Sequence, residues 1–123
     1  GERNVLNIFG DDYNTHDGTG IRDYIHVDDL ASGHIKALNV IREKSQLIIV
    51  NLGTGTGYSV FDVVRAVEKV SNQKIIYQVS KRREGDVDIS YSDPSYAKEV
   101  LKWEAKYNLE AMCYDSWNYK LKN

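Results

Sequence analysis

The order of apolar and polar residues predicts short strands and longer helices that follow one another. Runs rich in apolar and β-branched residues at 5–9, 47–52 and 74–79 predict strands. The run at 47–52 is almost entirely apolar, which is typical of a strand covered on both faces. From about residue 27 to 44, apolar residues recur every three or four positions, which predicts a helix. The polar, glycine-bearing stretch 10–20 predicts a long loop.

Later segments carry signals for the start of a helix. Ser59, followed three residues later by Asp62, forms a capping pattern before a run of apolar helix positions. Asp93 and Pro94 predict the N-cap and the first residue of another helix. Residues 109–121 have the spacing of a final amphipathic helix. Because strands and helices alternate along the chain, the sequence predicts an α/β fold.

The composition describes one soluble globular domain or a piece of a larger one. Of 123 residues, 41% are hydrophobic and 28% are charged, and 16 Lys and Arg against 18 Asp and Glu give a net charge of −2. This balance excludes a whole-chain electrostatic attraction to nucleic acid, and no apolar run approaches the ~20 residues that cross a bilayer. Cys113 is the only cysteine and no Cys/His spacing predicts a metal site, so we expect a cytoplasmic protein. Because the chain begins with Gly1 rather than Met, we also expect processing or missing upstream sequence.

The run Gly-Thr-Gly-Thr-Gly at 53–57 lies between a predicted strand and a predicted helix, as a dinucleotide-binding fingerprint does. Its spacing departs from Gly-x-Gly-x-x-Gly, because Tyr58 stands at the third glycine position. No clear ribose-binding acid follows about 20 residues later at a strand end. We therefore favour a tight turn between strand and helix over a dinucleotide site.

Tyr77 and Lys81 have the Tyr-x-x-x-Lys spacing of the proton-transfer pair in many nicotinamide-dependent reductases. That pair needs a helix, in which residues four apart share one face. Here the segment is predicted as a strand, in which four residues span about 13 Å. We therefore interpret Tyr77 as a packing residue, and likewise expect His34 at the edge of the core and Cys113 inside it.

Two arginine positions suit an anionic ligand. Arg22 closes the glycine-bearing loop, and the pair Arg82 and Arg83 follows the third predicted strand. A guanidinium donates two parallel hydrogen bonds and stays charged when it is partly desolvated, which favours a diphosphate. From the residues alone, the plainer alternative of a solvated surface arginine stays open at both positions.

Three longer motifs, in this order and at this spacing, resemble a known family. They are residues 9–38 (FGDDYNTHDGTGIRDYIHVDDLASGHIKAL), 50–64 (VNLGTGTGYSVFDVV) and 82–87 (RREGDV). Together they resemble the C-terminal portion of the UDP-glucose 4-epimerases, which belong to the extended short-chain dehydrogenases. The resemblance runs nearly from end to end and includes Trp103 and Trp117.

This resemblance implies that residues 1–123 are the C-terminal, UDP-sugar-binding portion of a Rossmann-like fold, whose N-terminal NAD-binding domain is absent from this chain. It also implies that the strand at 47–52 and the helix after it return to the main sheet. The parent enzyme would be a cytoplasmic homodimer that binds NAD and a UDP-hexose, with no nucleic acid or membrane partner. We expect the chain alone to be inactive, because it has no complete glycine fingerprint and no helical Tyr-x-x-x-Lys motif.

Position in the family motifs also implies a UDP-sugar site. Arg22 and Arg83 match diphosphate-binding arginines, and Asp86 matches the acid that holds a ribose hydroxyl. The remaining matches are Asn7, Ile8 and Phe9 along the uracil, Tyr24 as a more distant match, and Ser90 beside the hexose. None of these residues is expected to be catalytic, to bind NAD or to hold a metal.

The implied reaction interconverts UDP-glucose and UDP-galactose by transient oxidation at C4 with NAD. Since the hexose has to turn within the site, most of the binding energy has to come from UDP. A tyrosine at the position of Ser90 would fill the space that an N-acetyl group needs, and serine leaves it open, so the N-acetylhexosamine pair is also expected. The alternatives are another nucleotide-sugar enzyme, such as a dehydratase or decarboxylase, and a non-catalytic nucleotide-sugar-binding module.

Overall fold

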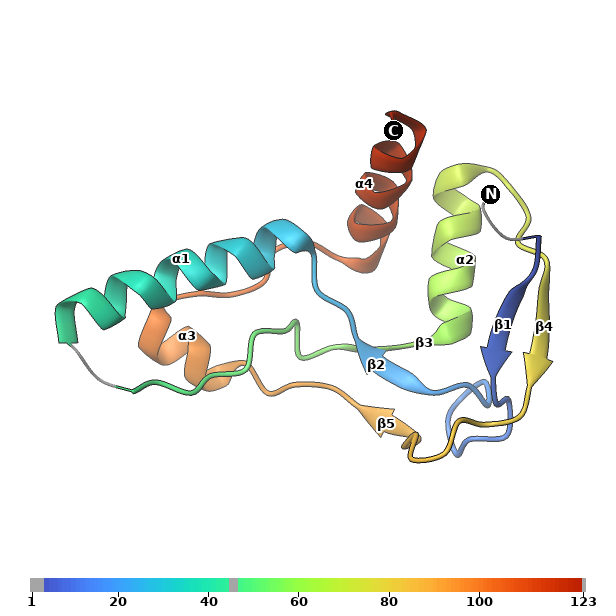
Figure 1. Ribbon diagram of the computed structural model, residues 1–123, viewed down its shortest axis with the longest axis horizontal. Coiled ribbons are helices and arrows are strands. Elements are labelled where there is room, and N and C mark those ends of the chain that lie inside the picture. Colours follow the sequence, from blue (N-terminus) through green and yellow to red (C-terminus); the bar gives the residue numbers. More distant parts are fainter. Residues whose placement is uncertain (1–3, 45–46, 123) are drawn as a thin grey trace.

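The computed structural model describes residues 4–44 and 47–122, in which strands and helices are interleaved along the chain (Figure 1). The strands are β1 (Leu6–Phe9), β2 (Ile21–Asp23), β3 (Gly57–Ser59), β4 (Tyr77–Ser80) and β5 (Ile89–Ser90). The helices are α1 (Val27–Lys44), α2 (Val60–Ser71), α3 (Ser95–Leu101) and α4 (Leu109–Lys122). This order confirms the predicted α/β class.

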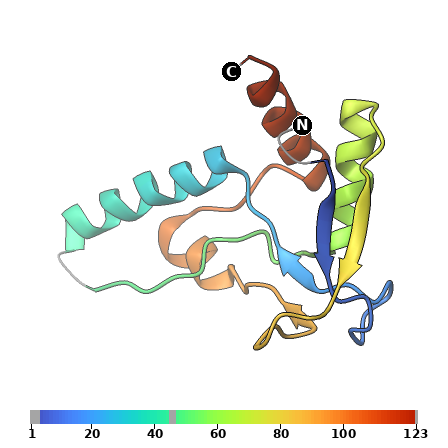
Figure 2. The ribbon, with the colours of Figure 1, turned by 45° about the vertical axis from the view of Figure 1, so that its right-hand side comes forward.

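The strands form two small sheets. β1 and β4 pair in parallel, with Leu6 opposite Tyr77 and Phe9 opposite Ser80. In the second sheet, β2 lies between β3, which is antiparallel to it, and β5, which is parallel. Figures 1 and 2 show α2, α4, β1 and β4 at one end of the molecule, and α1 and α3 at the other, with the second sheet between them. Both views show the ends of β1 and β4 side by side, next to the loop that leads into β2.

The start of α2 has the predicted capping box. The hydroxyl of Ser59 accepts a hydrogen bond from the backbone N–H of Asp62 at 3.0 Å, and the Asp62 carboxylate accepts one from the N–H of Ser59 at 2.9 Å. The same hydroxyl donates to the carboxylate of Asp17 at 2.5 Å, and Thr19 donates to Asp17 as well. These bonds attach the 10–20 loop to the first turn of α2, which fixes where β2 begins.

A small apolar cluster joins α1 to α3. Its buried members are Ala97, Leu101 and Trp103, and the indole N–H of Trp103 donates to the hydroxyl of Ser32 on α1 at 2.8 Å. Partly buried residues that pack against it are Ile25, Ala37, Val40, Val50, Leu52, Val100 and Ala105. A Cβ on Gly33 would lie 2.8 Å from Cδ1 of Leu52 and 3.3 Å from the indole of Trp103, so a larger residue here would require these side chains to shift.

Buried polar groups tie the start of α1 to α4. The carboxylate of Asp29, which is 2% exposed, accepts hydrogen bonds from the backbone N–H groups of Lys106 and Tyr107. The ring of His26 stacks on Tyr107 at 4.2 Å, and its Nε2 lies 3.1 Å from the carboxylate of Asp115 on α4. These bonds connect the two ends of the molecule.

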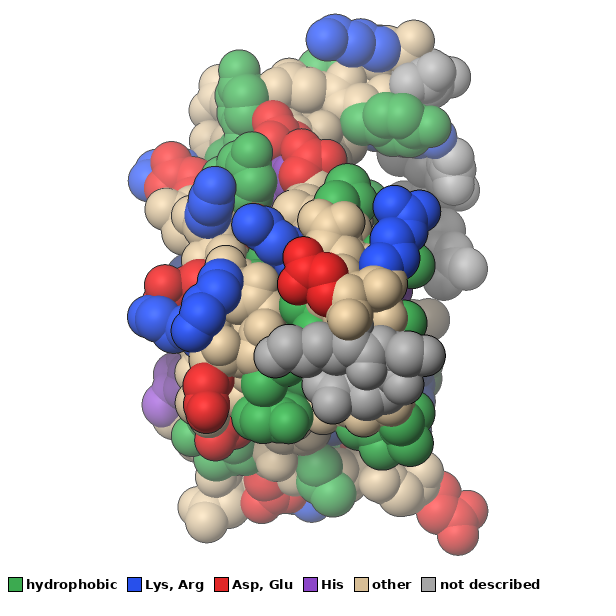
Figure 3. Space-filling model, turned by 90° about the vertical axis from the view of Figure 1, so that its left-hand side faces the viewer, with side chains coloured by type: hydrophobic (Ala, Val, Ile, Leu, Met, Phe, Trp, Pro, Cys, Tyr) green, Lys and Arg blue, Asp and Glu red, His purple; other side chains and the backbone are tan. Residues whose placement is uncertain are grey.

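The described residues leave one apolar face of α1 largely uncovered. Its exposed apolar residues are Val27, Leu30, Ile35, Leu38 and Ile41. Figure 3 views the molecule from the end at which α1 and α3 lie, and apolar side chains reach the surface there among charged ones. A surface of this kind is typical of contacts with another protein part.

The predicted strand at 47–52 is not a strand in the structure. The segment is irregular, and the side chains of Leu47 and Ile49 are 88% and 78% exposed. A strand requires a neighbouring strand for its backbone hydrogen bonds, and none of the described strands pairs with this segment. The composition of the run was typical of a strand, but no strand in the described part of the chain supplies its hydrogen-bonding partner.

Smaller corrections concern single residues. β4 begins at Tyr77 rather than at residue 74, and Pro94 is the N-cap of α3 rather than its first residue. His34 is exposed, not at the edge of the core, whereas Cys113 is buried as predicted. Tyr77 lies on a strand, so its spacing to Lys81 does not form the helical proton-transfer pair. None of the described helices is long and apolar enough to cross a membrane.

Candidate functional site

Residues from four distant parts of the chain surround a hollow of about 240 Å³, which we call the arginine hollow. Its lining residues are Asn7, Phe9, Tyr13, Gly20, Arg22, Val60, Arg83 and Asp86. Five of the eight residues proposed from the sequence are among them, namely Asn7, Phe9, Arg22, Arg83 and Asp86. The fold thus brings together positions that are up to 79 residues apart, counted from Asn7 to Asp86.

Arg22 enters the hollow from β2. Its Nη1 donates to the carbonyl of Ile21 at 2.7 Å, and its Nη2 lies 3.7 Å from the carboxylate of Asp86. Both side chains are about a third exposed, at 32% and 39%, so the ion pair faces solvent. Because a guanidinium has five N–H donors, Arg22 can bind an anion while it keeps these contacts.

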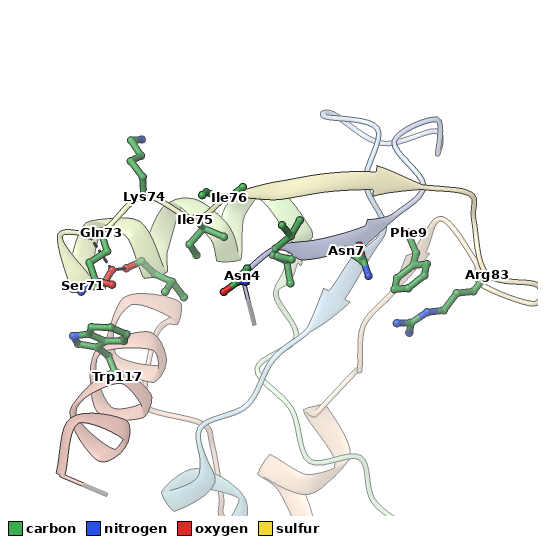
Figure 4. A pocket seen from close by; sticks show the side chains of 13 residues that line it. Asn4, Asn7, Phe9, Ser71, Gln73, Lys74, Ile75, Ile76, Arg83 and Trp117 are labelled. Atoms are coloured by element: carbon green, nitrogen blue, oxygen red, sulfur yellow. Dashed lines mark hydrogen bonds between the residues drawn. The ribbon is translucent and has the colours of Figure 1, made fainter. Parts of the chain in front are cut away.

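Arg83 lines the hollow from the loop after β4. Its guanidinium lies over the ring of Phe9, with Cζ 4.0 Å from the ring centre. Figure 4 shows this pair at the end of β1, with the side chain of Asn7 next to it. Arg83 therefore adds a second positive charge to the same hollow, on an aromatic support.

The neighbouring Arg82 has a different environment. Its Nε donates to the carboxylate of Asp12 at 2.6 Å, its Nη1 lies 3.8 Å from Asp88, and its Cζ lies 4.0 Å from the centre of the Tyr13 ring. The hydrogen bond to Asp12 raises the pKa of Arg82 further. The two adjacent arginines therefore have different surroundings. Arg82 is paired with groups of the protein, and Arg83 faces the arginine hollow.

A larger hollow of about 670 Å³, the strand hollow, adjoins the arginine hollow along β1. The two share Asn7, Phe9 and Arg83. Figure 4 shows its other wall, formed by the segment before β4 and by Trp117 of α4. Apolar side chains form much of this wall, so an aromatic base and a charged diphosphate would each find matching chemistry along β1.

Two other predicted residues, Ile8 of β1 and Tyr24 directly after β2, lie outside the arginine hollow, which Asn7 does line. Ile8 is 1% exposed and lines neither the arginine hollow nor the strand hollow. Asn7 accepts a hydrogen bond from the Gln78 side chain at 2.6 Å. Tyr24 is half-buried beside Met112 and Cys113 in a separate hollow, and burial raises its pKa. Tyr24 therefore lies apart from the arginines.

Ser90 lies on β5 directly opposite Arg22 in the parallel pairing of β2 and β5. It is exposed and lines a third hollow, of about 490 Å³, which we call the serine hollow. Arg22 lines this hollow too, so it connects the arginine hollow with Ser90. A ligand held by Arg22 could extend past Ser90.

Sequence reasoning missed Asp23. The backbone N–H groups of Thr54 and Gly55, within the glycine-rich turn, both donate to its carboxylate at 3.1 Å. These are the groups that would bind a pyrophosphate in a dinucleotide fingerprint. An internal anion occupies them here, which agrees with our preference for a tight turn. The only sequence signal was that such a turn presents N–H groups that need an acceptor.

One group of possible metal ligands occurs among the described residues, formed by His16, Asp17 and Asp62. Both carboxylates already accept hydrogen bonds from the protein: Ser59 donates to Asp17, and Arg65 donates to Asp62 at 2.7 Å. Hydrogen bonds from these partners hold the pKa of both carboxyls below the usual value, although burial opposes this. We therefore interpret the group as part of the attachment of the 10–20 loop to α2.

Comparisons with known proteins identify relatives of this chain. The family model of GDP-mannose 4,6 dehydratase matches residues 1–116. The chain is 55% identical to UDP-glucose 4-epimerase of Homo sapiens over 123 residues, which is all of this chain and 35% of that protein. It is 51% identical to UDP-glucose 4-epimerase of Bacillus subtilis over 123 residues, or 36% of that protein. The chain thus spans about a third of the length of these relatives.

Solved structures give the same result. UDP-glucose 4-epimerase from Bifidobacterium longum, in complex with NAD+ and UDP, matches with a TM-score of 0.95 and 45% identity, over 100% of this chain and 36% of that one. The UDP-Glc/GlcNAc 4-epimerase from Campylobacter jejuni matches with a TM-score of 0.87 and 40% identity, over 99% of this chain and 37% of that one. From the family model, the sequence identities and the fold together, this chain belongs to the GDP-mannose 4,6 dehydratase family and is a homologue of the UDP-glucose 4-epimerases.

Proposed function

We propose that this chain is the UDP-binding portion of an NAD-dependent UDP-glucose 4-epimerase, which interconverts UDP-glucose and UDP-galactose. The observation that carries the proposal is the convergence of Arg22 and Arg83 on one hollow with Asp86 and Phe9. Two guanidinium groups match the two charges of a diphosphate. The homologue from Bifidobacterium longum, solved with NAD+ and UDP, supports this choice of ligand.

Each part of UDP has a matching surface in this proposal. Arg22 and Arg83 bind the diphosphate, and Asp86 accepts a hydrogen bond from a ribose hydroxyl. The uracil lies along β1, where the backbone of residues 7–9 meets its polar edge and the Phe9 ring packs against it. Arg83, which already lies over Phe9 at 4.0 Å, joins the base end of the site to the phosphate end.

The reaction explains why the nucleotide has to be bound firmly and the sugar loosely. NAD held elsewhere in the whole protein would supply reversible hydride transfer at C4 of the hexose. Because the configuration at C4 is inverted, the hexose has to present its other face within the site, so strong contacts to it would slow the reaction. In this proposal, the chain binds the nucleotide end of the substrate and holds its diphosphate while the hexose turns.

The residues described here do not fit a dinucleotide cofactor. The glycine-rich turn directs its N–H groups at Asp23, so no step of the reaction is assigned to NAD bound by this chain. We propose that NAD binds to an N-terminal domain of the whole protein, as in the predicted domain arrangement.

The uncovered apolar face of α1 supports this arrangement. In the proposal, that face and the 47–52 segment pack against the NAD-binding domain, where the segment pairs with the edge of the main sheet. The relatives are about three times as long as this chain, which leaves sufficient sequence for such a domain. Leu47 and Ile49, at 88% and 78% exposed, would then be covered.

Ser90 supports a wider range of sugars. It is small and exposed beside Arg22, so an N-acetyl group at C2 of the hexose would find room there. The relative from Campylobacter jejuni is a UDP-Glc/GlcNAc 4-epimerase. We therefore propose that the whole enzyme also interconverts UDP-N-acetylglucosamine and UDP-N-acetylgalactosamine.

The test uses the natural protein that contains this sequence. We expect calorimetry to show UDP binding, and incubation with UDP-galactose to yield UDP-glucose of unchanged mass. A product that has lost water or carbon dioxide would support a dehydratase or a decarboxylase instead. UDP binding without any turnover would support a non-catalytic module, and absence of UDP binding would contradict the proposal.

A further inference from the structure

The carboxylate of Asp23 joins three segments that are far apart in the sequence. It lies at the end of β2, directly after Arg22. Thr54 donates to it from its backbone N–H at 3.1 Å and from its hydroxyl at 2.5 Å, and the N–H of Gly55 donates at 3.1 Å. From the other side, Ser92 donates its hydroxyl at 2.5 Å and its backbone N–H at 3.3 Å. Asp23 therefore binds the glycine-rich turn and the segment after β5 at once.

Two glycines of the neighbouring turn allow the close approach to this carboxylate. A Cβ on Gly53 would lie 2.0 Å from the hydroxyl of Ser92 and 2.4 Å from Oδ2 of Asp23. Gly55 has a positive φ of 70°, which favours glycine. Burial raises the pKa of Asp23, but the hydrogen bonds from Ser92 and Thr54 outweigh it and hold the pKa below its usual value. The group is an ionised anchor at neutral pH.

The segment that Asp23 holds includes Ser90. β5 consists of two residues and pairs with β2 only through Ile21 with Ile89 and Arg22 with Ser90. A strand this short gains little from its own pairing. The bonds from Asp23 to Ser92, two residues beyond Ser90, secure its far end. Without them, the segment could separate from β2 where the serine hollow opens.

We propose that Asp23 is a positioning residue that holds Ser90 against Arg22 and thereby sets the hexose end of the site. Asp23 itself contacts no ligand in this proposal. Arg22 keeps its own supports without Asp23, because it pairs with Tyr58 of β3 and contacts Asp86. Loss of the Asp23 carboxylate should therefore affect the hexose more than the nucleotide. The expected effect on turnover rests on the proposed function, whereas the expected effect on the position of the segment after β5 does not.

The first measurement is hydrogen exchange, which needs no activity. The natural protein that contains this sequence is compared with its Asp23→Asn variant, and Asp62→Asn serves as control, since Asp62 also accepts backbone and side-chain bonds but lies in the capping box of α2. We expect Asp23→Asn to speed exchange of the Thr54, Gly55 and Ser92 amides at least tenfold, and Asp62→Asn to leave them within threefold of the parent. If exchange at these amides is unchanged in Asp23→Asn, the inference is wrong.

The second measurement separates sugar from nucleotide. In Asp23→Asn we expect the affinity for UDP to stay within threefold and kcat for UDP-galactose to fall at least tenfold. Ser92→Ala removes one hydrogen-bond donor to Asp23 and keeps the Asp23 carboxylate, so kcat should fall by a smaller factor. This variant replaces Asp23→Asn in the test if Asp23→Asn does not fold. Equal losses of UDP affinity and turnover, or an unchanged kcat, would overturn the positioning role. If the parent itself has no epimerase activity, the proposed function fails, and the exchange result alone decides the inference.

Discussion

The adjacent residues Arg82 and Arg83 offer a sharp test of the proposed UDP site, because one faces the protein and the other faces the arginine hollow. We expect Arg83→Ala, in the natural protein that contains this sequence, to weaken UDP binding by about 1.5–3 kcal/mol, the usual worth of a hydrogen bond to a charged group. That loss corresponds to a dissociation constant about 10 to 150 times larger. This expected loss includes only the hydrogen bond from Arg83 to the diphosphate. Phe9 should keep its place on β1 when the guanidinium above its ring is removed.

Arg82→Ala is the matched control. It removes the same charge one residue away, but its partners are Asp12, Asp88 and the ring of Tyr13, so the affinity for UDP should change less than threefold. Arg83→Lys should recover only part of the affinity, because an ammonium cannot donate two parallel bonds. Isothermal calorimetry at fixed salt measures all three variants. Equal losses in Arg82→Ala and Arg83→Ala would show a general charge effect and refute the assignment of Arg83.

Four further outcomes are expected. Arg22→Ala should weaken UDP binding by about 1.5–3 kcal/mol in the same calorimetry, with partial recovery in Arg22→Lys. Ser90→Tyr should abolish turnover of the N-acetyl sugars and spare UDP-galactose in a competition assay, and equal effects on both would exclude the proposed gate. The purified 123-residue chain should show no epimerisation and should bind a hydrophobic dye at its uncovered apolar face; turnover free of contaminating enzyme would contradict this. The folded-state pKa values of Asp17, Asp23 and Asp62 are lowered, so they contribute stability that is complete above the unfolded pKa of about 3.9 and is lost as the pH falls through the lower folded values. Urea midpoints should therefore drop between pH 5 and pH 2, and midpoints that stay constant over this range would contradict that contribution.

The helices were the part of the fold that could be predicted from sequence. α1 spans Val27–Lys44, as the spacing of its apolar residues predicted, and Ser59 and Asp62 form the capping box at the start of α2. Such signals lie within a few residues of one another, and the bonds they predict are local. The structure needed no distant partner to satisfy them.

Strands were predicted only in part, and long-range bonds were not predicted. The runs at 5–9 and 74–79 contain β1 and the start of β4, whereas the run at 47–52 forms no strand. The 47–52 run has a strand composition, but a strand forms only where another backbone accepts and donates its hydrogen bonds. Asp23 bonds to Thr54 and Ser92, which are 31 and 69 residues away, so nothing near it in the sequence marked it. The convergence of Arg22, Arg83 and Asp86 likewise depended on how loops meet in space, and only the family resemblance pointed to it. Their roles toward UDP stay predictions.

The positions of the two tryptophans make the two ends of the molecule separately observable. Trp103 is 4% exposed within the cluster between α1 and α3, whereas Trp117 lines the strand hollow beside α2. Intrinsic fluorescence of Trp103→Phe would report only the α2 and α4 end, and that of Trp117→Phe only the other. Two emission curves that coincide during denaturation would indicate a single cooperative unit, held together by the bonds of His26 and Asp29. Curves that separate would mean that each end unfolds with its own midpoint.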